Sequence, residues 1–121
     1  MKEEVQNWWK QALLDLESAE KTFKIKIYYI SAFLAQQAVE KALKAFLIKK
    51  TGYFPRIHDI VELSRKAEAP LEIVELCALI NPAYTATRYP DVASVFEKGE
   101  VREILDSARE VLEWTKKKIR S

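Results

Sequence analysis

Residues 27–50, IYYISAFLAQQAVEKALKAFLIKK, decide the fold, because they read as one long helix with apolar side chains around most of its circumference. A helix on the surface of a protein keeps one polar face, and the first half of this segment has almost none. We therefore expect this helix to be central, covered by other helices or by a second subunit. Gly52 and Pro55 follow it and predict its end.

Helical patterns also flank the central segment on both sides. Residues 3–23 carry an apolar stripe at helical spacing, made of Val5, Trp8, Trp9, Ala12, Leu13, Leu16, Ala19 and Phe23. A further helix is expected from His58 or Asp59 to just before Pro70, and a short one over residues 71–80. Asn81-Pro82 is expected to break that short helix, and the last helix starts near Gly99. Residues 83–98 are the longest segment expected to be irregular.

These patterns predict one all-α domain over residues 1–121, an antiparallel up-and-down bundle of four to five helices. The chain has only 2 Gly and 4 Pro, whereas strands joined by tight turns usually need more of both. We also expect homodimerisation through a two-fold interface, because the central helix has more apolar circumference than a five-helix monomer can cover.

Composition excludes several functions. The formal net charge of +2 does not require a nucleic-acid partner, and RNA binding is left open. No apolar run reaches the length of a membrane span, so we expect a soluble, cytoplasmic protein without a membrane partner. The single cysteine, Cys77, is expected to be a buried apolar residue. One His and one Cys offer no ligand spacing, so we expect no metal, no cofactor and no catalytic residue set.

Polar residues inside the central segment are the first candidates for a site. Gln37, Lys41 and Lys44 fall at steps of four and three, so they share one face of the helix. Glu40 and Lys44 are spaced for a favourable ion pair. One interpretation is a solvated stripe; the other is a polar groove wall that faces a ligand or a partner subunit.

His58 and Asp59 are the second candidates. Asp59 is suited to complement the start of the next helix, with His58 capping or packing beside it. The functional alternative is an imidazole at the mouth of the same groove, oriented by this carboxylate. No serine or cysteine nucleophile accompanies the pair in the sequence.

The segment Tyr84-Thr85-Ala86-Thr87-Arg88-Tyr89-Pro90-Asp91 gathers aromatic, hydroxyl, guanidinium and carboxylate groups into eight positions. Arg88 is suited to pair with a phosphate or carboxylate, and Tyr84 or Tyr89 to stack on a base. The alternative is an internal lock in which Arg88 pairs with an acid of the bundle and the tyrosines fill its end.

At these residues the sequence resembles the HEPN domain, a nucleotide-associated helical domain. The resemblance covers nearly the whole chain and rests on Trp9 through Leu16, on Tyr29 and Phe33 leading into residues 36–45, on His58-Asp59-Ile60, and on residues 87–91. It implies a homodimeric bundle of four or five helices. It also implies a minimal nucleotidyltransferase as partner in a toxin–antitoxin-like pair, with the helical subunit binding the substrate, as in the helical domain of kanamycin nucleotidyltransferase.

Other HEPN members are ribonuclease toxins that carry an Arg followed four to six residues later by His. This chain departs from that pattern, because Arg88, Arg102 and Arg109 have no His at those positions. The sequence thus favours a nucleotide-related binding or partner subunit that uses Gln37, Lys41, Lys44, His58, Asp59, Tyr84, Arg88 and Tyr89. The alternatives are an RNA-cleaving toxin with a non-standard site and a ligand-free antitoxin or scaffold dimer.

Overall fold

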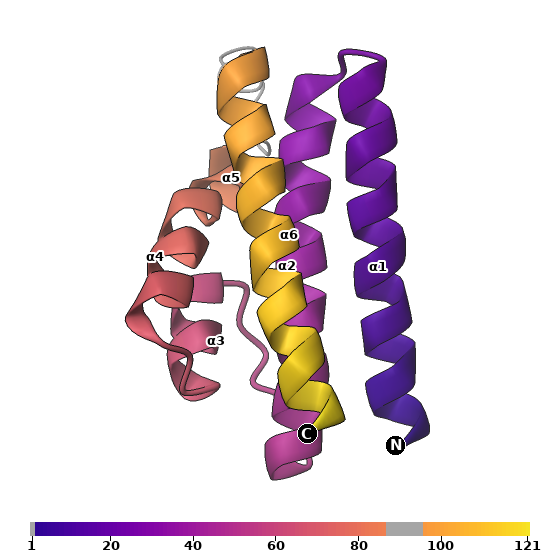
Figure 1. The fold of residues 1–121 in the computed structure, drawn as a ribbon, viewed down its shortest axis with the longest axis vertical. Helices are drawn as coiled ribbons and strands as arrows, with labels where there is room; N and C mark the ends of the chain where they lie inside the picture. The colour runs from indigo at the N-terminus through magenta and orange to yellow at the C-terminus, as the bar shows by residue number, and fades with distance from the viewer. Residues whose placement is uncertain (1, 87–95) are drawn as a thin grey trace.

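The computed structural model describes residues 2–86 and 96–121. Three long helices run side by side: α1 (Glu3–Lys24), α2 (Tyr28–Thr51) and α6 (Lys98–Arg120). Three short ones pack together beside them: α3 (Ile60–Lys66), α4 (Leu71–Ile80) and α5 (Pro82–Ala86) (Figure 1). The described residues form helices and their connections without a strand, which confirms the predicted all-α fold.

The long helices do not all alternate in direction. The chain rises through α1 and descends through both α2 and α6, as the positions of the two termini in Figure 1 show. Lys49 near the end of α2 therefore reaches the carbonyls of Ile119 and Ser121 at the end of α6. The short helices return the chain between α2 and α6, which is why α2 and α6 run parallel while α1 is antiparallel to both.

The central position of α2 is confirmed, and it is achieved within one chain. Its fully buried alanines, which let neighbouring helices approach closely, are Ala32, Ala35, Ala38, Ala42 and Ala45. Helices α1, α6 and α3 cover it, together with side chains of α4 and α5. Tyr29 remains 41% exposed in the first half of α2, so the homodimer stays a prediction.

The predicted apolar stripe of α1 is buried at Val5, Ala12 and Ala19, and it departs from the prediction at Leu13 and Asp15. Leu13 is 45% exposed, whereas Asp15 is buried. Asp15 is stabilised there because it accepts hydrogen bonds from Lys41 Nζ of α2 (2.6 Å) and from Gln11 Nε2 (2.9 Å). A carboxylate with an internal cation thus occupies a position on α1 that the apolar pattern did not assign to the core.

Helices α2 and α4 end where the sequence predicts, at Gly52 and at Asn81-Pro82. Gly52 closes α2 with a φ of 91°, a left-handed conformation that glycine adopts without strain. The expectation that residues 83–98 begin an irregular segment is wrong for its first part, because α5 covers Pro82–Ala86. Pro82 occupies the first helical position, where its missing N–H costs no hydrogen bond.

No described helix is both long enough and apolar enough to cross a membrane.

Candidate functional site

Glu40 is the centre of a buried polar cluster on α2. One oxygen of its carboxylate, Oε2, accepts a hydrogen bond from Lys44 Nζ at 2.9 Å and lies 3.0 Å from His58 Nδ1. The side chains of Glu40 and Lys44 are each only 5% exposed. The Lys44 ammonium also lies 5.2 Å from the ring centroid of Phe54 and 5.8 Å from that of Trp8. Paired charge and aromatic faces together compensate this lysine for its lost water.

Gln36 ties the segment before α3 to this cluster. Its amide nitrogen donates to the carbonyl of His58 at 3.1 Å and to Glu40 Oε1 at 3.4 Å. Its amide oxygen accepts from Gln37 Nε2 at 2.8 Å. Every buried polar side-chain atom among the described residues has a partner. The backbone and the side chain of His58 are thus both fixed to α2.

The His58 imidazole is fixed on one side and open on the other. Its side chain is 56% exposed, and its ring stacks on that of Tyr84 with centroids 4.8 Å apart and an angle of 16°. Contact with an ionised Glu40 favours a hydrogen on Nδ1. The second nitrogen, Nε2, has no partner among the described residues, so it can donate to or accept from a ligand according to protonation.

Asp59 and Asn81 form the floor next to His58. Asp59 Oδ1 accepts from the amides of Val61 (2.9 Å) and Glu62 (3.2 Å), the expected cap of α3. Asn81 Nδ2 donates to the same oxygen at 3.0 Å, and Asn81 Oδ1 accepts from the Ile60 amide. Asp59 therefore caps the helix, and Glu40 is the carboxylate that orients His58. The first interpretation of Asp59, as the cap of the next helix, is confirmed, and the alternative in which it orients the imidazole is wrong.

These groups surround a hollow of about 310 Å³, which we call the His58 hollow; it is lined by His58, Asp59, Asn81, Pro82, Tyr84 and Thr85. That volume is at the lower end of small-molecule sites. Its lining residues carry an imidazole, a carboxylate, an amide, hydroxyls and an aromatic ring. This set can hydrogen-bond a polar ligand and lie against a flat one.

The structure brings together only part of the predicted site. His58, Asp59 and Tyr84 line the hollow. Lys41 is paired with Asp15, and Lys44 is paired with Glu40. The interpretation of this face as a solvated stripe is wrong for Lys44, which is 4% exposed, while the predicted Glu40–Lys44 pair is confirmed. Arg88 and Tyr89 lie outside the described residues.

Glu40, Gln36 and Asn81 belong to the site. Sequence spacing indicates Glu40 as the partner of Lys44 and of Gln36, but it does not place any of the three among the ligand-binding residues. The sequence does carry a signal for a buried Glu40, because this acid precedes Lys44 by four residues in a helix that has hardly any polar face. Asn81 was interpreted only as a helix breaker. Nothing in the sequence placed it against Asp59, which lies 22 residues earlier.

Other chemically capable groups are engaged elsewhere. Arg102 donates to both oxygens of Glu20, at 2.8 and 3.2 Å, and Arg109 pairs with the same carboxylate. The Arg102 hydrogen bond is the main cause that holds the pKa of Glu20 below its ordinary value. Burial raises the pKa of Cys77 to about 12, so the thiol stays protonated at neutral pH, and its expected burial is confirmed. The described residues contain no group of ligands that could hold a metal ion.

The geometry defines the protein as an all-helical bundle with a buried polar cluster on its central helix. The chain belongs to the HEPN domain family, whose family model matches residues 5–119. The protein TT1696 from Thermus thermophilus has a similar crystal structure, with a TM-score of 0.89 and 28% identity over 97% of this chain and 99% of that one. The crystal structure of ST0689, an archaeal HEPN homologue, is similar, with a TM-score of 0.83 and 30% sequence identity over 98% of this chain and 99% of that chain.

A HEPN domain protein from Thermotoga maritima, TM0613, shares the fold, with a TM-score of 0.73 and 23% identity over 92% of this chain and 95% of that chain. No curated protein matches this chain.

Proposed function

We propose that this HEPN domain is a nucleotide-binding partner subunit that takes its ligand at the His58 hollow. The observation that carries the proposal is the His58 imidazole, which lines the hollow and is held by Glu40 through Nδ1. Buried groups that hold one exposed polar group in a single orientation are typical of binding sites.

The ligand class follows from the groups that line the hollow. The second oxygen of Asp59, for which the described residues supply no hydrogen bond, suits ribose hydroxyls, as an acidic residue does in dinucleotide-binding folds. The Tyr84 and His58 rings already stack on each other, so a base would lie against their edges or take the place of one ring. Lys41 and Lys44 are paired internally, so a phosphate would depend on Arg88, which enters the proposal from the sequence alone.

Affinity for a nucleotide is expected to be modest, with a Kd on the order of micromolar to millimolar, because no glycine loop or metal encloses the phosphates. Replacing His58 by Ala removes the fixed imidazole but leaves the Glu40–Lys44 pair intact. We expect His58→Ala to weaken ATP or GTP binding by about ten-fold in calorimetric titration, the worth of one charge-assisted hydrogen bond. Arg65→Ala, an exposed change on α3, should bind like the parent.

Arg88→Ala separates the two roles left open for that residue. If Arg88 binds the phosphate, the variant loses nucleotide binding and keeps its melting temperature. If the parent protein binds neither ATP nor GTP and Arg88→Ala melts far below it, Arg88 is a structural lock and the nucleotide site is refuted.

A second candidate function, RNA cleavage, is favoured by one observation only: Glu40 gives His58 the carboxylate partner that an acid–base imidazole uses. Against it, Arg88, Arg102 and Arg109 have no His four to six residues later, so the Arg–His pair of the ribonuclease members is absent from the sequence. We expect the purified protein to leave RNA intact in a gel assay. Robust cleavage that disappears in His58→Ala would show that the protein is a ribonuclease that uses His58.

The proposal includes self-association and a protein partner, a minimal nucleotidyltransferase in a toxin–antitoxin-like pair. Large apolar side chains are exposed on α2 and α4, among them Tyr29, Leu71 and Leu79. We expect light scattering at micromolar concentration to give twice the monomer mass of 14.0 kDa. A measured mass equal to that of one chain would contradict the predicted homodimer.

A further inference from the structure

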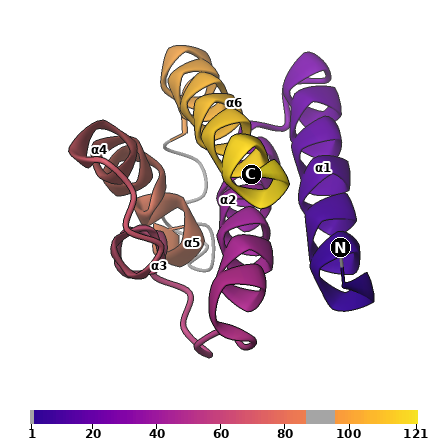
Figure 2. The same ribbon diagram turned by 60° about the horizontal axis from the view of Figure 1, so that its bottom comes forward.

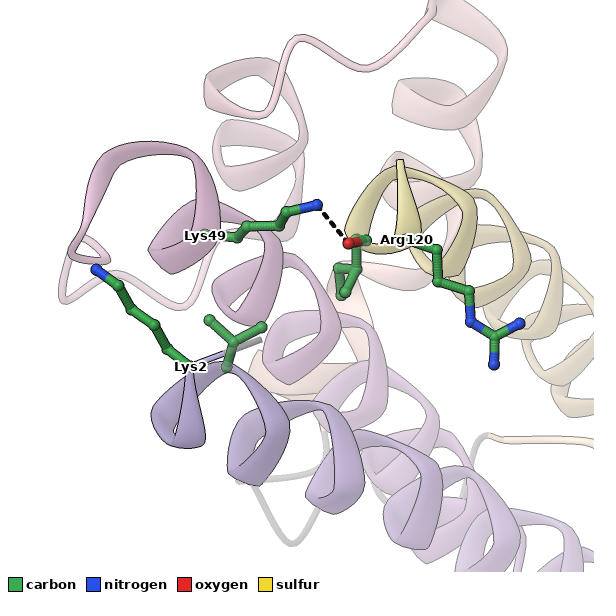
Figure 3. A pocket seen from close by; sticks show the side chains of 5 residues that line it. Lys2, Lys49 and Arg120 are labelled. Carbon is green, nitrogen blue, oxygen red and sulfur yellow. Dashed lines mark hydrogen bonds between the residues drawn. The ribbon is translucent and has the colours of Figure 1, made fainter.

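A groove lies between α1 and α6 on the side of the bundle away from α3 and α4. Both helices pack on α2, and Figure 2 shows them as two rods on either side of it. Three adjoining hollows of about 560, 300 and 170 Å³ form the groove; Arg120 lines all three, and Trp9, Lys116 and Ile119 each line two. Figure 3 shows the first of them, where Lys49 reaches from α2 to the last turn of α6.

The apolar residues that line this α1–α6 groove form its floor; they are Val5, Trp9, Leu13, Leu16, Leu112 and Ile119. Val5, Leu112 and Ile119 are already buried in the bundle, whereas Leu13 is 45% exposed. From Val5 to Leu16 the floor follows α1 for roughly 16 Å at 1.5 Å per residue, about three helical turns. Apolar residues spaced over three turns are what an amphipathic helix presents to a groove.

The rim of the groove is cationic. Its positive residues are Lys2, Lys10, Lys49, Arg109, Lys116 and Arg120, and the one acid among the lining residues is Glu113. Within the described part of the chain, Lys10, Lys116 and Arg120 form no ion pair. The protein as a whole is close to neutral, at +2, so this concentration of unpaired positive charge is local to the groove.

We propose that the α1–α6 groove binds an amphipathic helix of a partner protein whose apolar stripe is flanked by Asp and Glu. The apolar floor would bury the stripe, and the rim would pair with the acidic flanks, which steer association and fix the register. A nucleic acid fits less well, because Trp9 is the only aromatic residue in the groove lining, whereas single-strand binding uses successive stacking platforms. The proposal is independent of the His58 hollow, so either one can fail without the other.

The test is a selection of displayed random 14-residue peptides on the full-length chain. Peptides with apolar residues at i, i+3, i+4 and i+7 and with acidic flanks should be enriched. A synthetic copy of the strongest one is then titrated into the parent and into two pairs of variants. Its affinity should fall as salt is added, because rim charges are screened.

The variants come with matched controls. Leu13→Glu alters the floor, whereas Leu14→Glu changes the neighbouring leucine, which is 55% exposed and not part of the groove lining. Lys10→Glu with Lys116→Glu reverses the rim, and Lys66→Glu with Lys98→Glu gives the same net charge elsewhere. We expect the floor and rim variants to weaken peptide binding by about ten-fold or more, and both controls to bind within about two-fold of the parent.

Three results would overturn the proposal. The first is that the peptides fail the test, either because the selection does not enrich acidic amphipathic peptides or because the enriched peptides bind the rim variant and its control equally. Another is a single-stranded oligonucleotide that binds with the same dependence on Lys10 and Lys116 while the peptides do not. The third is a parent dimer that the rim variant turns into a monomer, since a second copy of this chain would then fill the groove.

Discussion

Replacing Glu40 by Ala is expected to lower the free energy of unfolding by about 3–5 kcal/mol, because it leaves the Lys44 ammonium buried without its carboxylate. The change also removes the partner of His58 Nδ1 and one acceptor of Gln36. Urea unfolding followed by circular dichroism measures the loss.

Two controls show whether the stranded charge is the cause. Glu17 and Lys21 form an i,i+4 pair on α1 in which the acid also precedes the lysine, but their side chains are 60% and 72% exposed. Glu17→Ala should therefore cost no more than about 0.5 kcal/mol. Adding Lys44→Met to Glu40→Ala should recover much of the lost stability, because no buried charge remains. If Glu40→Ala unfolds like Glu17→Ala, the buried cluster does not exist as described.

Leu43→Ala is expected to cost about 3 kcal/mol, because Leu43 is fully buried in the core around α2 and the deletion leaves a cavity. Leu14→Ala removes the same atoms from α1 at a side chain that is 55% exposed, so its cost should be within about 0.5 kcal/mol. Urea unfolding of the two variants measures both costs. Equal costs would contradict the central placement of α2 inside a single chain.

Much of the helical layout could be predicted from the sequence because it depends on local signals. The apolar circumference of residues 27–50 predicted a central helix, Gly52 its end, and Asp59 the cap of α3. Five buried alanines let α1 and α6 approach α2 closely, whereas Tyr29 stays exposed, so the pattern alone does not decide whether a second subunit covers α2.

The site was harder to predict because it depends on tertiary contacts. Lys44 and Lys41 share a helical face, yet Lys44 is buried against Glu40, whereas Lys41 reaches across to Asp15 of α1. His58 and Asp59 are neighbours in sequence, yet their partners lie on α2 and at Asn81. Helical spacing indicates which residues share a face, but it does not indicate what lies opposite that face.

The site claim is tested most directly by nuclear magnetic resonance of the isotope-labelled chain during titration with ATP and GTP. We expect the chemical-shift changes to concentrate at the His58 hollow, in the His58 ring and the amides of Asp59 and Thr85. His58→Ala should reduce these changes. Shifts confined to the α1–α6 groove, or none at about millimolar nucleotide, would contradict the claim that the His58 hollow is the ligand site.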